Sequence, residues 1–548
     1  MNDSETAHVT KKRKWLLGIG ILSVLGTAAL LIAAYLLSHR LEPYIRHQAI
    51  EYLQKRFDSE VELGPLQARM PTTSSLKVLL WGGHDRSVRV EGEGISLRHR
   101  GRRDIPPIFA MKKFAFEVDL ATLFNKTKTV HSVMIDGMEI NIPPKADRPK
   151  FHAGPDEDSK PAENQPETNV IIEQVLVTNS DLTVFPKQQD HTPLHFALHR
   201  IKLESAGKNV AMKYEATLTN AKPPGVIQSK GTFGPWAAAE PGDTPLAGEY
   251  DFEHADLGVF SGIAGTLNST GQFEGTLNSI QVRGEASVPN FRLKTSGNPV
   301  SLKTRFDVLV DGTNGNTILK PVVGRLGTTS FTTSGGIIKH EKAQKHAISL
   351  DVTMPNGDLR DVLTLAMKGP PFMEGRLSLH THIDIPPLSG KVREKLRLDG
   401  RFELSQTRFL KSKIQNEIDT LSRRGRGEPG NEDIVEVPSG MAGSFRLAHE
   451  VITFRSLSFA VAGAGVDLTG SYDLARDTLD FHGSLKLRAK VSETMTGWKR
   501  WALKPLNPFF AKQGAGTLIN IQVTGTSKEP KFERDHGKKE KELAESTR

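Results

Sequence analysis

Apolar residues recur at every second position through most of the chain, from about Val61 to the C-terminal region. The clearest runs are Phe445 and Leu447, Ile452 and Phe454, Leu457 with Phe459 and Val461, Val466 and Leu468, and Leu479 and Phe481. Successive side chains of a strand point to opposite faces of a sheet, so a period of two predicts strands with one apolar and one polar face. Turn-prone residues such as Arg476 and Asp477 separate the runs. The pattern predicts a mainly β fold, with consecutive antiparallel hairpins near the C-terminus.

Composition supports this fold class and excludes several functions. Among 548 residues the chain has 49 Gly and 31 Pro, and 7% of its residues are aromatic, which favours many short strands over long helices. It has no Cys, which excludes disulfides, thiolate metal sites and cysteine nucleophiles. The net charge of +9 comes from 72 basic and 63 acidic residues. Because no dense basic block carries interleaved aromatic residues, we do not expect nucleic-acid binding.

The N-terminus carries one long apolar segment, from Trp15 to Leu37. It holds no charged residue, and as a helix it would be about 34 Å long, enough to cross a hydrocarbon core of ~30 Å. Four basic residues precede it, namely Lys11, Lys12, Arg13 and Lys14, and basic residues stay on the cytoplasmic side of such segments. The apolar run is longer than that of a signal peptide and ends without a small-x-small cleavage site. We expect an uncleaved single-pass anchor, with a cleaved signal peptide as the alternative.

Helical spacing is confined to short stretches outside the anchor. Apolar residues from Leu41 to Phe57 predict an amphipathic helix, either a stalk or lid near the membrane or a helix packed on the first strands. Further helical pieces are expected at about Leu359–Met367, Phe409–Leu421 and Ser492–Lys512. The last piece mixes aromatic and basic residues, which fits either a cap on the sheet or a membrane or partner contact. Three polar segments should be irregular: Pro143–Asn169, Ser422–Asp433 and Ser527–Arg548.

The usual catalytic signatures are missing from the sequence, including the G-x-S-x-G elbow, the phosphate-binding loop and H-E-x-x-H. The most suggestive cluster is His380, His382 and Asp384, which alternation places on one strand face where they could share a metal. A solvated strand face is the simpler interpretation, and the same holds for His195 and His199. We therefore assign no catalytic residue, no metal site and no cofactor.

Two parts of the chain share the pattern of one known family. Leu41–Gln67 reads LEPYIRHQAIEYLQKRFDSEVELGPLQ, a helix leading into a strand with an L-G-x-L turn. Ile383–Gly427 combines a strand, a hairpin and a helix, and Asp467–Phe532 supplies closing strands that end in G-T-x-x-x-P. These segments resemble the AsmA-like family of Gram-negative envelope proteins, relatives of TamB and YhdP, which include bridge-like lipid transfer proteins.

The resemblance implies an elongated antiparallel sheet curved into a groove, with a few short capping helices and the N-terminal anchor in the inner membrane. Its apolar face would shield phospholipid acyl chains, and seven residues would line it: Phe445, Leu447, Ile452, Phe454, Leu457, Phe459 and Val461. Expected partners are phospholipid, the inner membrane and an outer-membrane or envelope protein. The alternative is a non-conducting scaffold that assists outer-membrane protein biogenesis, in which the same strands form a closed sandwich core.

The expected organisation follows from these segments. It comprises a cytoplasmic N-terminus (1–14), the anchor (15–37), a helix and first strands of an AsmA-like domain (38–142), a Pro-rich acidic loop (143–169), a strand array (170–382), an AsmA-like C-terminal region (383–526) and a charged tail (527–548). Residues 38–548 are expected in the periplasm.

Overall fold

The computed structural model describes residues 59–69, 87–99, 102–119, 127–143, 169–185, 192–207, 211–235, 240–339, 346–388, 390–489, 517–527 and 529–535, together with Ile50, Gln54 and Ala237. The chain divides into two compact units. The first comprises Met1–Asp256, Leu267–Gly284 and Val310–Asn314, and the second comprises Leu257–Thr266, Glu285–Leu309 and Gly315–Arg548.

Several predicted segments fall outside the described residues. They include the anchor from Trp15 to Leu37 with its basic flank, nearly all of the helix predicted from Leu41 to Phe57, and the stretch Ser492–Lys512. Within the described part of the chain, no helix has the length and apolar character needed to cross a membrane.

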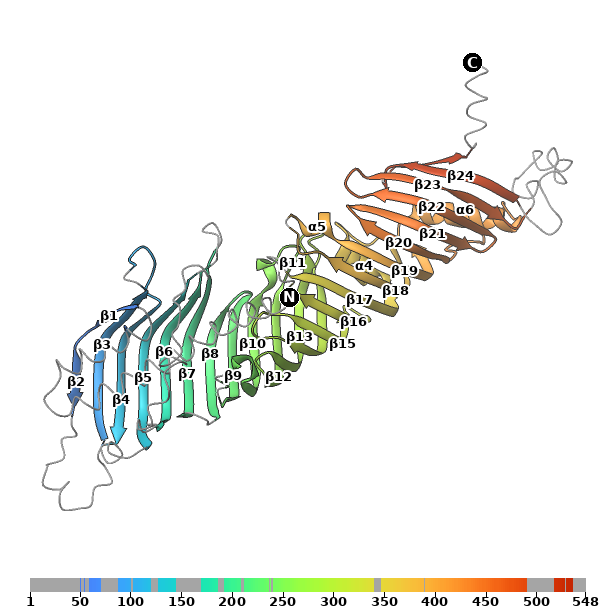
Figure 1. Cartoon of the computed structure of the whole chain (residues 1–548). Helices are drawn as coiled ribbons and strands as arrows, with labels where there is room; N and C mark the ends of the chain where they lie inside the picture. The colour runs from blue at the N-terminus through green and yellow to red at the C-terminus, as the bar shows by residue number, and fades with distance from the viewer. Residues whose placement is uncertain are drawn as a thin grey trace, which may run out of the picture. The chain divides into compact units, whose positions relative to one another are not determined.

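The first unit is built from strands that pair side by side (Figure 1). They are β1 (Ser59–Leu63), β2 (Leu66–Arg69), β3 (Ser87–His99), β4 (Phe109–Asp119), β5 (Thr127–Ile142), β6 (Asn169–Val184), β7 (Leu194–Gly207), β8 (Met212–Ala221), β9 (Pro224–Phe233), β10 (Pro245–Asp256) and most of β12 (Thr266–Thr276). A 3₁₀ turn, η3 (Pro241–Asp243), precedes β10, and β13 (Ser279–Leu293) belongs partly to each unit.

The second unit continues with the same architecture. It holds a 3₁₀ turn, η4 (Leu257–Val259), and β11 (Ile263–Ala264), β14 (Val300–Val310), β15 (Thr317–Leu326), β16 (Thr329–Ile338), β17 (Ala347–Asp358), β18 (Met373–Ile385), β19 (Arg397–Phe409), β20 (Ser439–Ala448), β21 (Val451–Val461), β22 (Ala464–Asp473), β23 (Thr478–Leu487), β24 (Thr517–Gly525) and β25 (Pro530–Arg534). Its helices are α4 (Leu359–Ala366), α5 (Val392–Lys395) and α6 (Ser412–Arg426).

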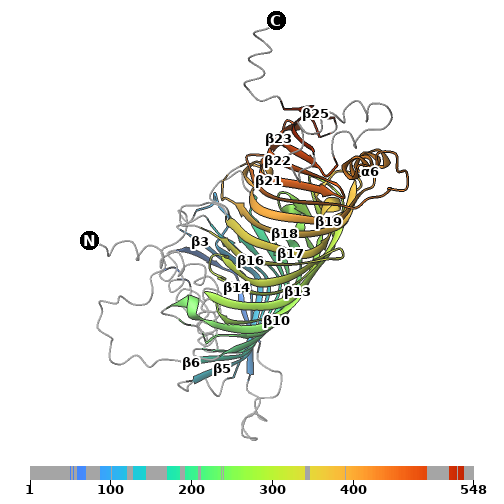
Figure 2. The same ribbon diagram turned by 90° about the vertical axis from the view of Figure 1, so that its right-hand side faces the viewer.

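The fold is mainly β with few helices, as the alternation predicts. The 25 strands of the described residues belong to one hydrogen-bonded, open sheet, and individual strands such as β10 and β17 bend visibly (Figure 2). Pairing is antiparallel except between β5 and β6, which run parallel from Thr127 opposite Asn169 to Ile142 opposite Val184. This parallel pair departs from the expected antiparallel pattern. It needs a connection that returns along the whole strand, and residues 144–168, between the two strands, lie outside the described residues.

The apolar side chains of β1 to β6 form the most deeply buried core of the first unit. Val90, Val130, Val133 and Ile135 are each 2% exposed, and Ile50 packs against the same cluster. Full burial of side chains of this size stabilises the fold by about 1.5–3 kcal/mol each. This end of the first unit is therefore a closed core.

Two of the predicted helices are present, and both ends of the second differ from the prediction. Helix α4 ends within one residue of the predicted Leu359–Met367. Helix α6 begins at Ser412 rather than Phe409, because Phe409 still pairs with Met373 in the sheet. It continues to Arg426, so the prediction of an irregular segment starting at Ser422 is wrong there. The Ser422 hydroxyl donates to the carbonyl of Ala462 at 2.8 Å, which holds this last part of the helix against the sheet.

Aromatic rings lie over glycines of the neighbouring strand at several places on the apolar side of the sheet. Phe331 is paired with Gly324, and a Cβ added at Gly324 would lie 2.1 Å from the ring. Phe114 covers Gly92 in the same way. Cross-strand aromatic contacts of this kind stabilise a sheet and compensate for the missing glycine side chain. The rings lie against the sheet instead of projecting from it.

Asp361 ties helix α4 to the turn between β15 and β16. Its Oδ2 accepts hydrogen bonds from the backbone N–H and the hydroxyl of both Thr328 and Thr329, at 2.8 to 3.0 Å. We expect Asp361→Ala to weaken this attachment by about 2–4 kcal/mol, because the donors of Thr329, which is 1% exposed, lose their acceptor. Hydrogen exchange of the α4 amides measures the effect, and Asp361→Asn, which keeps a carbonyl acceptor, should cost less. Equal protection in all three proteins would contradict the assignment.

Candidate functional site

Backbone pairing aligns the apolar side chains of β18 to β23 into rows, and we call their common side the apolar face. One row runs through Thr381, Gly400, Phe445, Phe454, Gly470 and Phe481, and the next through Leu379, Phe402, Gly443, Leu457, Leu468 and Gly483. Two further rows contain Leu377, Leu404, Met441, Phe459, Val466 and Leu485, and Ile383, Leu398, Leu447, Ile452, Tyr472 and Leu479. The seven residues proposed from the sequence all lie on this face.

A β-bulge in β21 explains why the sequence alternation changes phase. Phe454 pairs with Phe445, whereas Ser456 pairs with Ser444, so Arg455 is an extra residue on β21. The extra residue returns Leu457 to the side already occupied by Phe454. The same shift appears opposite β22, between Phe454 and Leu457.

Four phenylalanines form a connected cluster at the centre of the apolar face. The Phe402 ring lies 6.2 Å from that of Phe445 and 6.4 Å from that of Phe454, and Phe454 lies 5.7 Å from Phe481. These separations are typical of favourable tilted and edge-to-face contacts. The rings of Phe402, Phe445 and Phe454 are half-buried, whereas Phe481 is buried. The cluster therefore retains apolar surface that other groups can contact.

Helices α4 and α6 cover one margin of the apolar face. Val362 and Leu363 of α4 pack around Leu377 and Leu404. Ile418 and Leu421 of α6 pack in a second cluster with Val461, Ala464 and Leu487. Among the described residues, these two clusters do not include the row of Ile383, Leu398 and Ile452. Helices α4 and α6 therefore form a wall along one margin of the apolar face.

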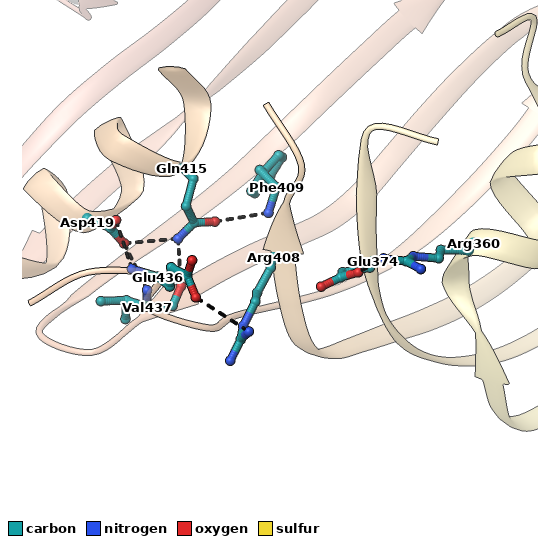
Figure 3. Close-up of polar contacts among 8 residues, drawn as sticks. All are labelled: Arg360, Glu374, Arg408, Phe409, Gln415, Asp419, Glu436 and Val437. Atoms are coloured by element: carbon teal, nitrogen blue, oxygen red, sulfur yellow. Dashed lines mark hydrogen bonds and ion pairs between the residues drawn. The ribbon is translucent and has the colours of Figure 1, made fainter. Parts of the chain in front are cut away.

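A buried polar network fixes α6 in this position (Figure 3). Asp419, 4% exposed, accepts from the backbone N–H of Val437 at 2.9 Å and of Glu436 at 3.0 Å. The Gln415 amide donates to Asp419 Oδ1 at 2.9 Å and to the Val437 carbonyl at 3.1 Å. Its oxygen accepts from the N–H of Phe409 at 3.0 Å. The network joins the helix to the end of β19 and to the segment that leads into β20.

The opposite face of the same strands is polar and carries ion pairs between strands, three of them between direct neighbours and one, Arg455 to Asp399, across β20. They join His382 to Asp351 at 2.9 Å, Arg397 to Asp384 at 3.5 Å, Arg455 to Asp399 at 3.8 Å and Lys486 to Asp467 at 2.8 Å. Exposed pairs contribute little energy singly. Together they keep this face solvated while the other stays apolar.

The structure places His380, His382 and Asp384 on this polar face, each with a different partner. His380 Nδ1 lies 3.0 Å from the Thr353 hydroxyl, while His382 is within hydrogen-bond distance of both Asp351 and Ser349. Asp384 pairs with an arginine. In the described ranges, no group of three or more His, Cys, Asp or Glu side chains is arranged to hold a metal.

His195 and His199 are likewise engaged separately in the first unit. His195 Nε2 lies 3.0 Å from Asp181 Oδ1, and His199 Nε2 lies 2.8 Å from the Thr219 hydroxyl. A register shift between Leu198 and Arg200 inserts His199 as a bulge. The two imidazoles therefore interact with different neighbouring strands.

A hollow of about 650 Å³ lies over the polar face of the first unit. Lys202, Glu215, Lys230 and Glu249 are direct neighbours across β7 to β10, so charges alternate along the row. Lys202 is held by Glu204, whose hydrogen bond raises the pKa of the lysine, and the same bond lowers the pKa of Glu204. A balanced lattice of paired charges carries no excess that would select an anion or a cation.

Two residues of the phenylalanine cluster were not among the predicted lining residues. Phe402 lies on β19 and Phe481 on β23, and each alternates correctly within its own strand. That alternation was the available signal, but it does not specify which strands are neighbours.

No family model, curated protein or solved structure matches the chain.

Proposed function

We propose that the apolar face of β18 to β23 is a groove that holds phospholipid acyl chains, and that the protein handles phospholipid or transports it between membranes. The observation that carries the proposal is the alignment of apolar side chains, most of them half-buried and some separated by glycines, into rows on one face of an open sheet. The AsmA-like resemblance points to the same function. In this proposal the segment Trp15 to Leu37 anchors the chain in the inner membrane, with residues 38–548 in the periplasm.

The dimensions and energetics of the face fit an acyl chain. Six strands at a spacing of about 4.8 Å span about 24 Å, which exceeds the half-thickness of about 15 Å that one acyl chain occupies in a bilayer. Each buried methylene contributes about 0.8 kcal/mol, so contact along eight of them would supply about 6 kcal/mol. No catalytic group is needed, because removal of apolar surface from water provides the driving force.

A scaffold that assists outer-membrane protein biogenesis is the second candidate. It is favoured by the first unit, where the apolar side of β1 to β6 is a closed core with side chains such as Val130 and Val133 at 2% exposure. A closed core supports mechanical stability and leaves no surface for lipid.

Photo-crosslinking separates the two functions. A benzophenone amino acid at Phe454 or Leu457 should crosslink to phospholipid in membranes, because both residues lie on the apolar face. The matched controls are Thr453 and Ala460, neighbours in the same strand that are exposed on the other face, and these should give no lipid adduct. Lipid adducts that are equal at all four positions, or missing from all four, would favour the scaffold.

Introducing a charge into the face should expel the lipid. We expect Leu457→Asp to lower the phospholipid that copurifies with the full chain by about tenfold or more, because a carboxylate in an apolar groove is costly to desolvate. Thr453→Asp, in the same strand but on its polar side, should leave the lipid content unchanged. Mass spectrometry of the purified variants gives the ratio, and an unchanged ratio in Leu457→Asp would contradict the groove.

A further inference from the structure

The segment that leads from β19 into α6 exposes apolar and basic side chains side by side. Leu410 is 49% exposed and Ile414 is 36% exposed, and Lys411 and Lys413 are exposed between them. Neither lysine has an ion-pair partner among the residues that the structure describes. We call these four residues the α6 patch.

Two ion pairs lie close to the α6 patch (Figure 3). Arg408 pairs with Glu436 at 3.7 Å, and Arg360 pairs with Glu374. Among the described residues, Lys411 and Lys413 take part in no ion pair of this kind, and the nearest further acidic residue on the exposed side of α6 is Glu417, one turn beyond Lys413. Lysines in the first turn of a helix oppose its dipole, so they are not there to stabilise α6.

The backbone around the α6 patch is held in place by specific contacts. The Leu410 N–H donates to the Phe372 carbonyl at 2.9 Å, and the rings of Phe372 and Phe409 lie 6.5 Å apart. Gln415 holds the Phe409 N–H from inside the helix. The backbone on both sides of the patch is thus fixed, and the apolar side chains have no route into the core.

We propose that the α6 patch docks this part of the second unit onto the surface of an anionic phospholipid bilayer. Lysines pair with anionic headgroups, and Leu410 and Ile414 enter the boundary between headgroups and acyl chains, the arrangement of interfacial helices. Charge complementarity favours this occupant, because an anionic surface supplies the two exposed lysines with partners that the described residues do not. The proposal goes beyond the lipid groove and holds equally if the protein is a scaffold.

A fluorescent label tests the contact directly. Because the chain has no Cys, Ile414→Cys provides a single site for an environment-sensitive dye on the full chain held in phosphatidylcholine nanodiscs. Addition of phosphatidylglycerol vesicles should shift the emission to the blue. The matched control is Ile338→Cys, a site that is 40% exposed and precedes Lys339, and it should not respond. A label at position 414 that stays unshifted overturns the proposal and leaves a protein partner as the occupant.

Charge reversal tests the role of the lysines. Each lysine near an anionic surface strengthens binding by about fivefold, so Lys411→Glu with Lys413→Glu should weaken vesicle binding by about 25-fold or more. The reversed charges agree with the helix dipole, so the helix should remain folded, and Lys339→Glu is the control. An equal response to phosphatidylcholine vesicles, or unchanged binding of the double variant, overturns the proposal.

Discussion

Replacing Asp419 with alanine is expected to detach helix α6 from the second unit. The substitution leaves the N–H groups of Glu436 and Val437 and one amide hydrogen of Gln415 without their acceptor. Each unsatisfied buried donor costs about 1–3 kcal/mol, so a loss of about 3–5 kcal/mol is expected for this closely coupled group. Hydrogen exchange of the α6 amides is the appropriate measurement, because a chain of two units need not unfold in one step.

A matched variant on the same helix checks that the loss is specific. Glu417 is exposed two positions earlier, and Glu417→Ala should change the local stability by less than about 0.5 kcal/mol. Protection in Asp419→Ala that equals that of Glu417→Ala would show that the buried network does not hold the helix. The α6 patch depends on the same network, so Asp419→Ala should also reduce the vesicle response of the label at position 414.

The second large effect is expected at Gly425, near the end of α6. A Cβ added there would lie 2.4 Å from the Gly463 carbonyl oxygen and 2.6 Å from its carbonyl carbon, both backbone atoms that cannot turn aside. Gly425 also accepts a hydrogen bond from the N–H of Ala489 at 3.0 Å. We expect Gly425→Ala to destabilise the packing of α6 on the β21–β22 turn by about 2–4 kcal/mol.

The sign of this effect makes the test decisive. Glycine to alanine inside a helix normally stabilises it by about 1 kcal/mol, so a destabilised α6 can come only from the contact with Gly463. The control is Gly440→Ala, where the nearest atom to the new Cβ is the Leu404 oxygen at 3.5 Å, an ordinary contact. Hydrogen exchange of the α6 amides at increasing denaturant concentration compares Gly425→Ala with Gly440→Ala. Greater protection of α6 in Gly425→Ala than in the unmodified protein would refute the close packing.

The strands and their faces could be predicted because alternation is a local property. The runs around Phe445, Phe454 and Phe459 became β20 and β21 with those rings on one face. The helix that begins at Leu359 was likewise predicted from the helical spacing of its own apolar residues. The metal interpretation of His380 and His382 shows the limit, because alternation places both on one face but does not reveal Thr353 and Asp351 as their partners.

Other features depended on residues that are distant in the sequence. The extension of α6 past Ser422 depends on a contact with Ala462. The close approach of Gly425 to Gly463 is likewise predicted by no pattern of neighbouring residues in the sequence. The parallel pairing of β5 with β6 was not expected either, because a period of two is the same in both strand directions.

The sequence by itself determined that the chain forms half-apolar strands, where most of them lie and which side chains share a face, since these follow from the geometry of a single extended strand. The tertiary structure alone decided the register. Pairing brought Phe402 against Phe445 and Phe454, turned separate hairpins into the rows of the apolar face, and set α4 and α6 along one margin. Register depends on backbone hydrogen bonds and packing between separate segments, and no single segment encodes them.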